Sequence, residues 1–199
     1  MSPRSSVREA ERTRSAVVAG AIDLASTGGL EPLSIGRLAT SLEMSKAGVV
    51  GPFGSKEALQ LATIDEANAI FTREVWDPAE GEKPGLPRLR AICEAWVSYL
   101  ERDVFPGGCF LTQAAAEFDG RPGPVRDSVS RALNLWDRVL TREAAIAVDR
   151  GELPPATDPA QVAFEIAAVA QGVNQARQAR DDPEAAARGR RAMDRVLAR

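Results

Sequence analysis

The chain of 199 residues contains no histidine, and this absence excludes several kinds of chemistry. Histidine is the commonest general base, the commonest metal ligand and the side chain that changes charge near neutral pH. Cysteine is scarce as well, because Cys93 and Cys109 are too few and too far apart for a disulfide framework or a zinc cluster. Both lie in apolar surroundings, so we expect buried, reduced thiols; a redox switch is the alternative.

Long apolar runs and phosphate-binding loops are also missing. No stretch approaches the roughly 20 apolar residues that span a bilayer, and the N-terminus lacks the apolar run of a signal peptide. We therefore expect a cytoplasmic protein with no membrane partner. The chain has neither a G-x-x-x-x-G-K-[ST] nor a G-x-G-x-x-G motif, and no spacing singles out carboxylates such as Glu117 and Asp119. The sequence predicts no enzyme, no metal site and no cofactor.

What the chain does contain is typical of a globular all-α protein. It is 44% hydrophobic and 27% charged, helix-forming residues dominate, and β-branched residues never alternate along a run. The net charge of −3 is unevenly spread, with about +2 on residues 1–56 and −5 on the remainder. This distribution fits a protein that touches nucleic acid at one end, although so small a difference also arises by chance.

Residues 34–56, SIGRLATSLEMSKAGVVGPFGSK, are the most informative stretch. Ser34, Ser45 and Ser55 each stand where a helix is expected to begin, and serine is a preferred N-cap. The expected elements are two short helices, about residues 34–41 and 45–51, and a longer helix from residue 55. Two helices joined by a tight turn form a rigid corner whose second helix fits the DNA major groove. The pattern therefore predicts a DNA partner.

The order of short motifs here resembles the TetR family of bacterial transcriptional regulators. The motifs that carry the resemblance, over about residues 10–60, are Ala21-Ile22-Asp23-Leu24-Ala25, Gly28-Gly29, Leu33-Ser34-Ile35, Leu38-Ala39, Met44-Ser45-Lys46, Phe53 and Ser55-Lys56-Glu57-Ala58-Leu59. The family usually ends its recognition helix with Tyr-x-His-Phe, whereas this chain has Val50-Gly51-Pro52-Phe53. Pro52 biases Gly51 away from helix, so the recognition helix should end near Val50 or Gly51. Glu43 replaces the small residue often found at the turn.

Hydrophobic spacing and breaker residues predict nine helices and no strand. The expected helices cover residues 8–26, 34–41, 45–51, 55–76, 89–104, 109–119, 124–149, 159–180 and 184–198. We expect the chain up to about Ser6 to be disordered and Asp77-Pro78 to end the fourth helix. A TetR-like regulator has the same helix count. The resemblance implies a DNA-binding domain over residues 1–55, with the helix from residue 55 as linker, and a ligand-binding and dimerisation domain over residues 56–199.

The expected DNA-binding residues lie on this corner and on the N-terminal segment. Lys46 is the best candidate for a contact with a base edge or a phosphate, and Lys56 resembles the family's phosphate-contacting lysine. The alternative is that the serines only cap helices and the lysines are only solvated. The full set is Ser34, Ser45, Lys46, Ala47, Val50, Lys56, Arg4 and Arg8.

A second set of residues predicts a ligand site in the body. Large aromatic side chains fall on the helices that surround a cavity in TetR-like proteins, with polar groups nearby that could orient a bound molecule. Plain core packing is the alternative for each aromatic residue. A pocket of this composition suits an uncharged apolar or aromatic effector. The candidates are Trp76, Trp96, Tyr99, Phe110, Gln113, Glu117, Trp136 and Asn174.

The last two helices carry apolar stripes, and the resemblance implies that they pair with a second subunit. The stripe residues are Val162, Ile166, Val169, Ala170, Val173, Met193, Val196 and Leu197. Such a homodimer would read a palindromic operator in double-stranded DNA. The sequence thus predicts a bacterial repressor released by a small-molecule effector. The alternative is a helical ligand-binding or interaction protein whose degenerate helix-turn-helix binds no specific DNA.

Overall fold

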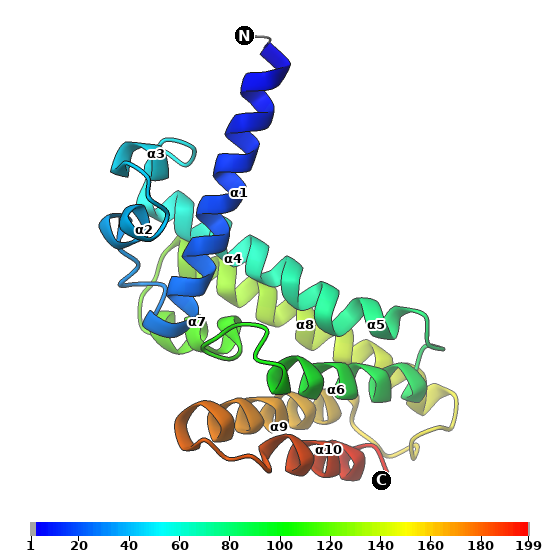
Figure 1. Ribbon diagram of the computed structural model, residues 1–199. Coiled ribbons are helices and arrows are strands. Elements are labelled where there is room, and N and C mark those ends of the chain that lie inside the picture. Colours follow the sequence, from blue (N-terminus) through cyan, green and yellow to red (C-terminus); the bar gives the residue numbers. More distant parts are fainter. Residues whose placement is uncertain (1–2, 199) are drawn as a thin grey trace. The chain divides into compact units, whose positions relative to one another are not determined.

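The computed structural model describes residues 3–198, with side chains from residue 8 onward, and these residues form helices and loops without any strand (Figure 1). The elements are α1 (Pro3–Gly28), α2 (Ile35–Ser41), α3 (Lys46–Val50), α4 (Lys56–Phe71), the π-helical turn η1 (Thr72–Trp76), α5 (Asp77–Glu80), α6 (Leu86–Glu101), α7 (Phe110–Phe118), α8 (Pro124–Asp149), α9 (Pro159–Arg180) and α10 (Ala185–Val196). The predicted all-α fold is confirmed.

Two differences from the predicted helices have simple causes. The fourth helix does not end at Asp77-Pro78, because α4, η1 and α5 follow one another without a gap as far as Glu80. Pro78 directly follows the π-helical turn η1, in which the Asp77 N–H donates to the Thr72 carbonyl, and this local change of helix type lets the run continue past the proline. Counted as one run, these elements leave nine helices among residues 3–198, as predicted. The second difference is that α1 begins at Pro3, so the segment expected to be disordered is helical from that residue.

The chain forms two compact units. The first unit comprises Met1–Asn68 and Phe105–Ser130, and the second comprises Ala69–Val104 and Arg131–Arg199. The divisions fall inside α4 and α8, so each of these helices contributes residues to both units.

In the first unit, α1, α2 and α3 close a small apolar core. Leu38 of α2 and Val49 of α3 are fully buried, with Val17 and Ala21 of α1. The helices α1 and α2 approach closely at Gly20, where a Cβ would lie 3.0 Å from a methyl carbon of Leu42. These buried side chains fix the angle between α2 and α3, which is the feature that a DNA-reading corner requires.

The second unit is built around α6, whose apolar face is buried as its spacing predicted. Both α9 and α10, orange and red in Figure 1, pack against α6 and against each other. Arg190 of α10 donates hydrogen bonds to Glu94 at 2.9 Å and to Glu101 at 2.8 Å, both on α6. These bonds lower the pKa of Glu101 and raise the pKa of Arg190.

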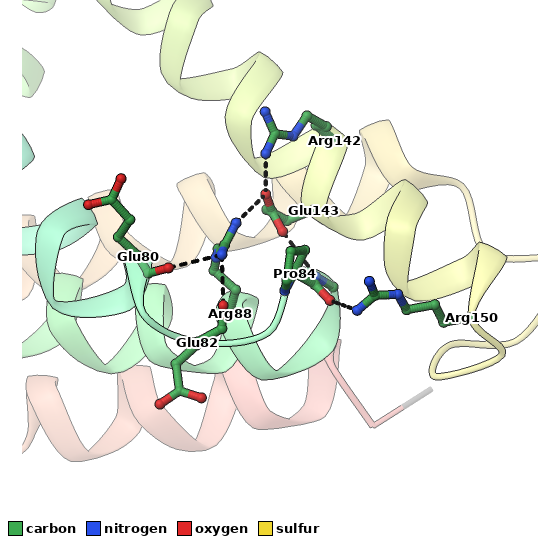
Figure 2. Close-up of polar contacts among 8 residues, drawn as sticks. Glu80, Glu82, Pro84, Arg88, Arg142, Glu143 and Arg150 are labelled. Carbon is green, nitrogen blue, oxygen red and sulfur yellow. Dashed lines mark hydrogen bonds and ion pairs between the residues drawn. The ribbon is translucent and has the colours of Figure 1, made fainter.

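A fully buried glutamate anchors the start of α6 in this unit (Figure 2). The Glu143 carboxylate accepts hydrogen bonds from the Gly85 N–H at 3.0 Å and from Arg142 at 3.1 Å, and it pairs with Arg88 at 3.4 Å. Arg88 also donates to the carbonyls of Glu80 at 2.9 Å and Glu82 at 2.7 Å. A buried carboxylate is tolerated only with such partners, so Glu143 and Arg88 are mutually dependent.

We expect Glu143→Ala to lower the free energy of unfolding by about 3–5 kcal/mol, because it leaves the guanidinium of Arg88 buried without its counter-charge. Urea titration followed by circular dichroism measures this change. Glu82→Ala is the matched control, since its side chain is exposed and only its carbonyl takes part in the network. The control should lie within about 0.5 kcal/mol of wild type. A loss below about 1 kcal/mol for Glu143→Ala would contradict the interpretation.

Both cysteines are buried thiols, as predicted. Burial, with a smaller contribution from the nearby Asp194 carboxylate, raises the pKa of the Cys93 thiol to about 12. At pH 8 the reactive thiolate is then on the order of one part in 10,000 of this cysteine.

We therefore expect no reaction of either cysteine with Ellman's reagent at pH 8 until the chain is unfolded in guanidinium. Ala116→Cys, at an exposed position of α7, supplies a positive control that should react at once. Rapid labelling of the native wild-type protein would show that the thiols are accessible and would restore the redox alternative.

Candidate nucleic-acid interface and ligand site

The α2–α3 corner is held by two serine caps and one strained turn residue. The hydroxyl of Ser34 accepts the Arg37 N–H at 3.4 Å, and the hydroxyl of Ser45 accepts the Gly48 N–H at 3.0 Å. Between the helices, Glu43 adopts a left-handed conformation with φ of 53°. This conformation favours glycine, which lacks a Cβ, so Glu43 carries backbone strain at the turn. The recognition helix ends at Val50, as predicted, but Gly51 keeps a right-handed helical conformation with φ of −47° and ψ of −48°, so the expected bias of Pro52 on Gly51 is wrong.

Most of the residues predicted to bind DNA are exposed on this corner. Lys46 lies beside the first turn of α2, since a Cβ at Gly36 would lie 3.5 Å from Lys46 Cε and 3.7 Å from the Ser34 hydroxyl. The corner thus brings the ammonium-bearing side chain of α3 next to the capped end of α2. Val50 is only half-buried, and the exposed members of the set are Arg8, Ser34, Ser45, Lys46, Ala47 and Lys56. The side chain of Arg4 lies outside the part of the chain described.

An arginine of α1 supports the segment after the recognition helix. The guanidinium carbon of Arg14 lies 4.6 Å from the centre of the Phe53 ring, a cation–π contact. Phe53 also donates its backbone N–H to the Val50 carbonyl at 2.9 Å. The two side chains are far apart in sequence, so no local pattern could have predicted this contact.

Lys56, predicted to bind phosphate, has an intramolecular partner. Its ammonium donates to the carbonyl of Glu31 at 2.6 Å, in the loop between α1 and α2. The carboxylate of Glu31 in turn pairs with Arg121 at 3.1 Å. A carbonyl satisfies one donor of the ammonium and leaves its charge unneutralised, so the exposed side of Lys56 can still face an anion.

Glu117, expected to line a ligand pocket, instead faces the same loop. One of its carboxylate oxygens accepts the Leu30 N–H at 2.8 Å and the Glu31 N–H at 3.0 Å. Gln60 of α4 donates to the Leu30 carbonyl at 2.8 Å. The sequence reading missed this arrangement, because a glutamate on an amphipathic helix carries no local sign of a backbone partner elsewhere in the chain.

The predicted aromatic residues fall into three groups. Trp96, Tyr99 and Trp136 surround Phe71, with ring centres 5.6, 5.5 and 5.0 Å from the Phe71 ring and edge-to-face geometry. Phe71 is buried and was not among the ligand candidates. The indole N–H of Trp136 is buried and has no hydrogen-bond partner among the residues described.

The remaining ligand candidates lie elsewhere. Trp76 lies under the Arg88 guanidinium, whose carbon is 5.5 Å from the ring centre, and Asn174 is half-buried on α9. Phe110 and Gln113 belong with Glu117 to α7 in the first unit, so the eight candidates are divided between the two compact units.

The apolar stripes of α9 and α10 are mostly used within the chain. Val162, Ile166, Val173, Met193 and other stripe residues are buried, so they cannot be the contacts to a second subunit that the sequence suggested. Exposed apolar surface on α9 comes instead from Phe164, which is 64% exposed. Close packing at Gly189, where a Cβ would lie 2.3 Å from Val173, leaves a shallow groove of about 270 Å³ between the two helices.

The chain is similar to known proteins in both sequence and structure. Residues 85–193 match the family model described as the tetracyclin repressor-like C-terminal domain. A comparison with curated protein sequences finds no match. Among residues 3–198, no helix combines the length and apolarity required to cross a membrane.

Solved structures similar to this one extend over the whole chain. A TetR transcriptional regulator from Chloroflexus aurantiacus is 25% identical with a TM-score of 0.85, and 96% of this chain covers 95% of that one. A TetR-family regulator from Cytophaga hutchinsonii is 20% identical with a TM-score of 0.82 and the same coverage. AibR, solved in complex with isovaleryl coenzyme A and operator DNA, is 19% identical with a TM-score of 0.72, and 94% of this chain covers 96% of it.

Proposed function

This chain belongs to the TetR family of transcriptional regulators, and on that premise we propose that it is a homodimeric repressor. The dimer binds a palindromic operator through two copies of the α2–α3 corner and leaves it when a small molecule binds. The observation that carries the proposal is the capped corner itself, with its two serine caps and the exposed Lys46 of the recognition helix.

The corner supports a contact between Lys46 and a DNA phosphate in particular. Its side chain lies along the first turn of α2, so the ammonium and the outward N–H groups of that turn can approach the same phosphate. Lys56 and Arg8 add positive charge on exposed positions of the same unit. The missing Tyr and His of the family pattern make these cations the main source of phosphate affinity.

We expect Lys46→Ala to raise the Kd for operator DNA by about ten-fold or more and to reduce the slope of log Kd against log salt by about one per subunit. A gel-shift titration at several salt concentrations, with DNA from upstream of the protein's own gene, measures both quantities.

Lys83→Ala removes the same charge from an exposed loop of the second unit and should leave both quantities unchanged. If the wild-type protein binds only weakly and without sequence preference, the proposal fails. The alternative of a helical protein with a degenerate DNA-binding corner then takes its place.

For the effector, we propose an uncharged apolar or aromatic molecule that contacts the aromatic group around Phe71. Trp96 and Trp136 offer edge-to-face surfaces, with ring centres 5.6 Å apart. The buried indole N–H of Trp136 supplies a donor for one acceptor atom of the ligand. A ligand that prefers the released state weakens DNA binding only by its differential affinity for the two states. AibR, solved with isovaleryl coenzyme A and operator DNA, supports ligand control in a protein of this fold. The ligand class proposed for this chain rests on its own aromatic group.

For the dimer, we propose that α9 and α10 pair with their copies in a second subunit. The support is the exposed Phe164 of α9, together with the shallow groove between α9 and α10 that is bordered by Gly172 and Ala192. A large exposed aromatic residue on a helix of small residues is typical of a protein interface.

We expect Phe164→Asp to convert the protein to a monomer at micromolar concentration, because it buries a charge in the interface. Sedimentation equilibrium measures the association. Leu135→Asp is the control: this residue of α8 is 52% exposed, and its replacement should leave the dimer intact. A Phe164→Asp variant that remains dimeric would place the interface elsewhere.

A further inference from the structure

The loop between α1 and α2 depends on side chains from other helices for its backbone hydrogen bonds. Residues 29–33 join the C-terminus of α1 to the Ser34 cap of α2. The Leu30 and Glu31 N–H groups donate to Glu117 of α7, and their carbonyls accept from Gln60 and Lys56 of α4. Leu30 and the hydrogen bond from Gln60 to its carbonyl are buried, and the two bonds to Glu117 are partly buried, so loss of these partners would leave backbone groups poorly solvated.

The carboxylate of Glu117 packs closely against the backbone of this loop. A Cβ at Gly29 would lie 2.4 Å from Glu117 Oε1, and Gly29 has a φ of 92°, which disfavours any other residue. One oxygen of Glu117 therefore faces the bare backbone of Gly29 while the other accepts two N–H groups. Hydrogen bonds to a carboxylate are stronger than bonds between neutral groups, and Glu117 makes two of them to this loop.

The loop is also clamped from the segment that leads into α7. A Cβ at Gly107 would overlap the carbonyl of Ser26, at 1.5 Å, so this segment packs directly on the backbone of the last turn of α1. The α7 region thus contacts the head, formed by α1, α2 and α3, at two places. Gly107, just before α7, packs on the last turn of α1, and Glu117, within α7, binds the loop that follows α1. The helix α7 belongs to the same compact unit as α1, α2 and α3.

We propose that Glu117 is a positioning residue for DNA recognition. By holding the Leu30 and Glu31 amides, it fixes the loop that sets where α2 begins, and α2 fixes the recognition helix α3. The helix α7 is then part of the DNA-reading head, although it lies about 60 residues beyond α3 in the sequence. A displacement of α7 reaches the recognition helix through this carboxylate as well as along α4. The inference rests on the proposed DNA-binding function.

We expect Glu117→Ala to weaken operator binding by about ten-fold, with much less effect on binding to non-specific DNA, because the phosphate-contacting cations remain while the corner loses its fixed orientation. Glu117→Gln keeps an oxygen that can accept both amides, so it should restore most of the operator affinity. Asp119→Asn makes the same change of charge two residues away, at an exposed position, and should bind as wild type. The operator probe is the duplex that the wild-type dimer enriches from random-sequence DNA.

Amide hydrogen exchange supplies a measurement that is independent of DNA. In Glu117→Ala the Leu30 and Glu31 amides should exchange at least ten-fold faster, while the Gly29 amide, bonded to the Ala25 carbonyl at 2.9 Å, keeps its protection. Operator binding within two-fold of wild type, or an equal loss on operator and non-specific DNA, would overturn the inference. If the wild-type protein enriches no operator, the proposed function fails, and unchanged exchange of the two amides would separately refute the role of Glu117.

Discussion

The backbone of the loop between α1 and α2 is the constraint on which the DNA-reading part of this molecule depends. A loop that turns between two packed helices exposes N–H and C=O groups that need partners. Here the partners are a carboxylate from α7 and an amide and an ammonium from α4, with Arg121 paired to Glu31. The loop that leads into α2 is therefore held both by nearby side chains of α4 and by Glu117, which lies more than 60 residues beyond the recognition helix.

In the second unit, backbone N–H groups at the start of α6 likewise depend on side chains from elsewhere in the chain, one of them the buried Glu143. Glu143 binds the Gly85 N–H and Arg88, while Glu152 accepts the Leu86 N–H at 2.8 Å, so two carboxylates cap the start of α6. The same arginine lies over the Trp76 ring and binds two loop carbonyls. Because the start of α6 is fixed, Trp96 and Tyr99 on this helix have defined positions. A ligand that contacts them can then displace α6 as a unit.

Local patterns were reliable where the physics is local. Serine caps, helix-breaking glycines and three-four apolar spacing predicted the limits of α2, α3, α8 and α9 to within about one residue. They were less reliable where a side chain has a choice of neighbours. The sequence predicted Val162 and Met193 as interface residues, but both are buried within the chain. It predicted Glu117 as a pocket residue, but the carboxylate of Glu117 accepts hydrogen bonds from the backbone of the loop between α1 and α2. Periodicity identifies which face of a helix is apolar but not which neighbour covers it.

The sequence by itself determined that this protein is all-α, that it begins with a helix-turn-helix corner, and that Lys46 is exposed on it. Those properties follow from capping, spacing and breaker residues, all of which act within a few positions along the chain. Only the tertiary structure decided that Arg14 supports Phe53, that Phe71 is the centre of the aromatic group, and that α7 belongs to the head. These depend on contacts between residues distant in sequence, and such contacts are fixed only when the whole chain packs.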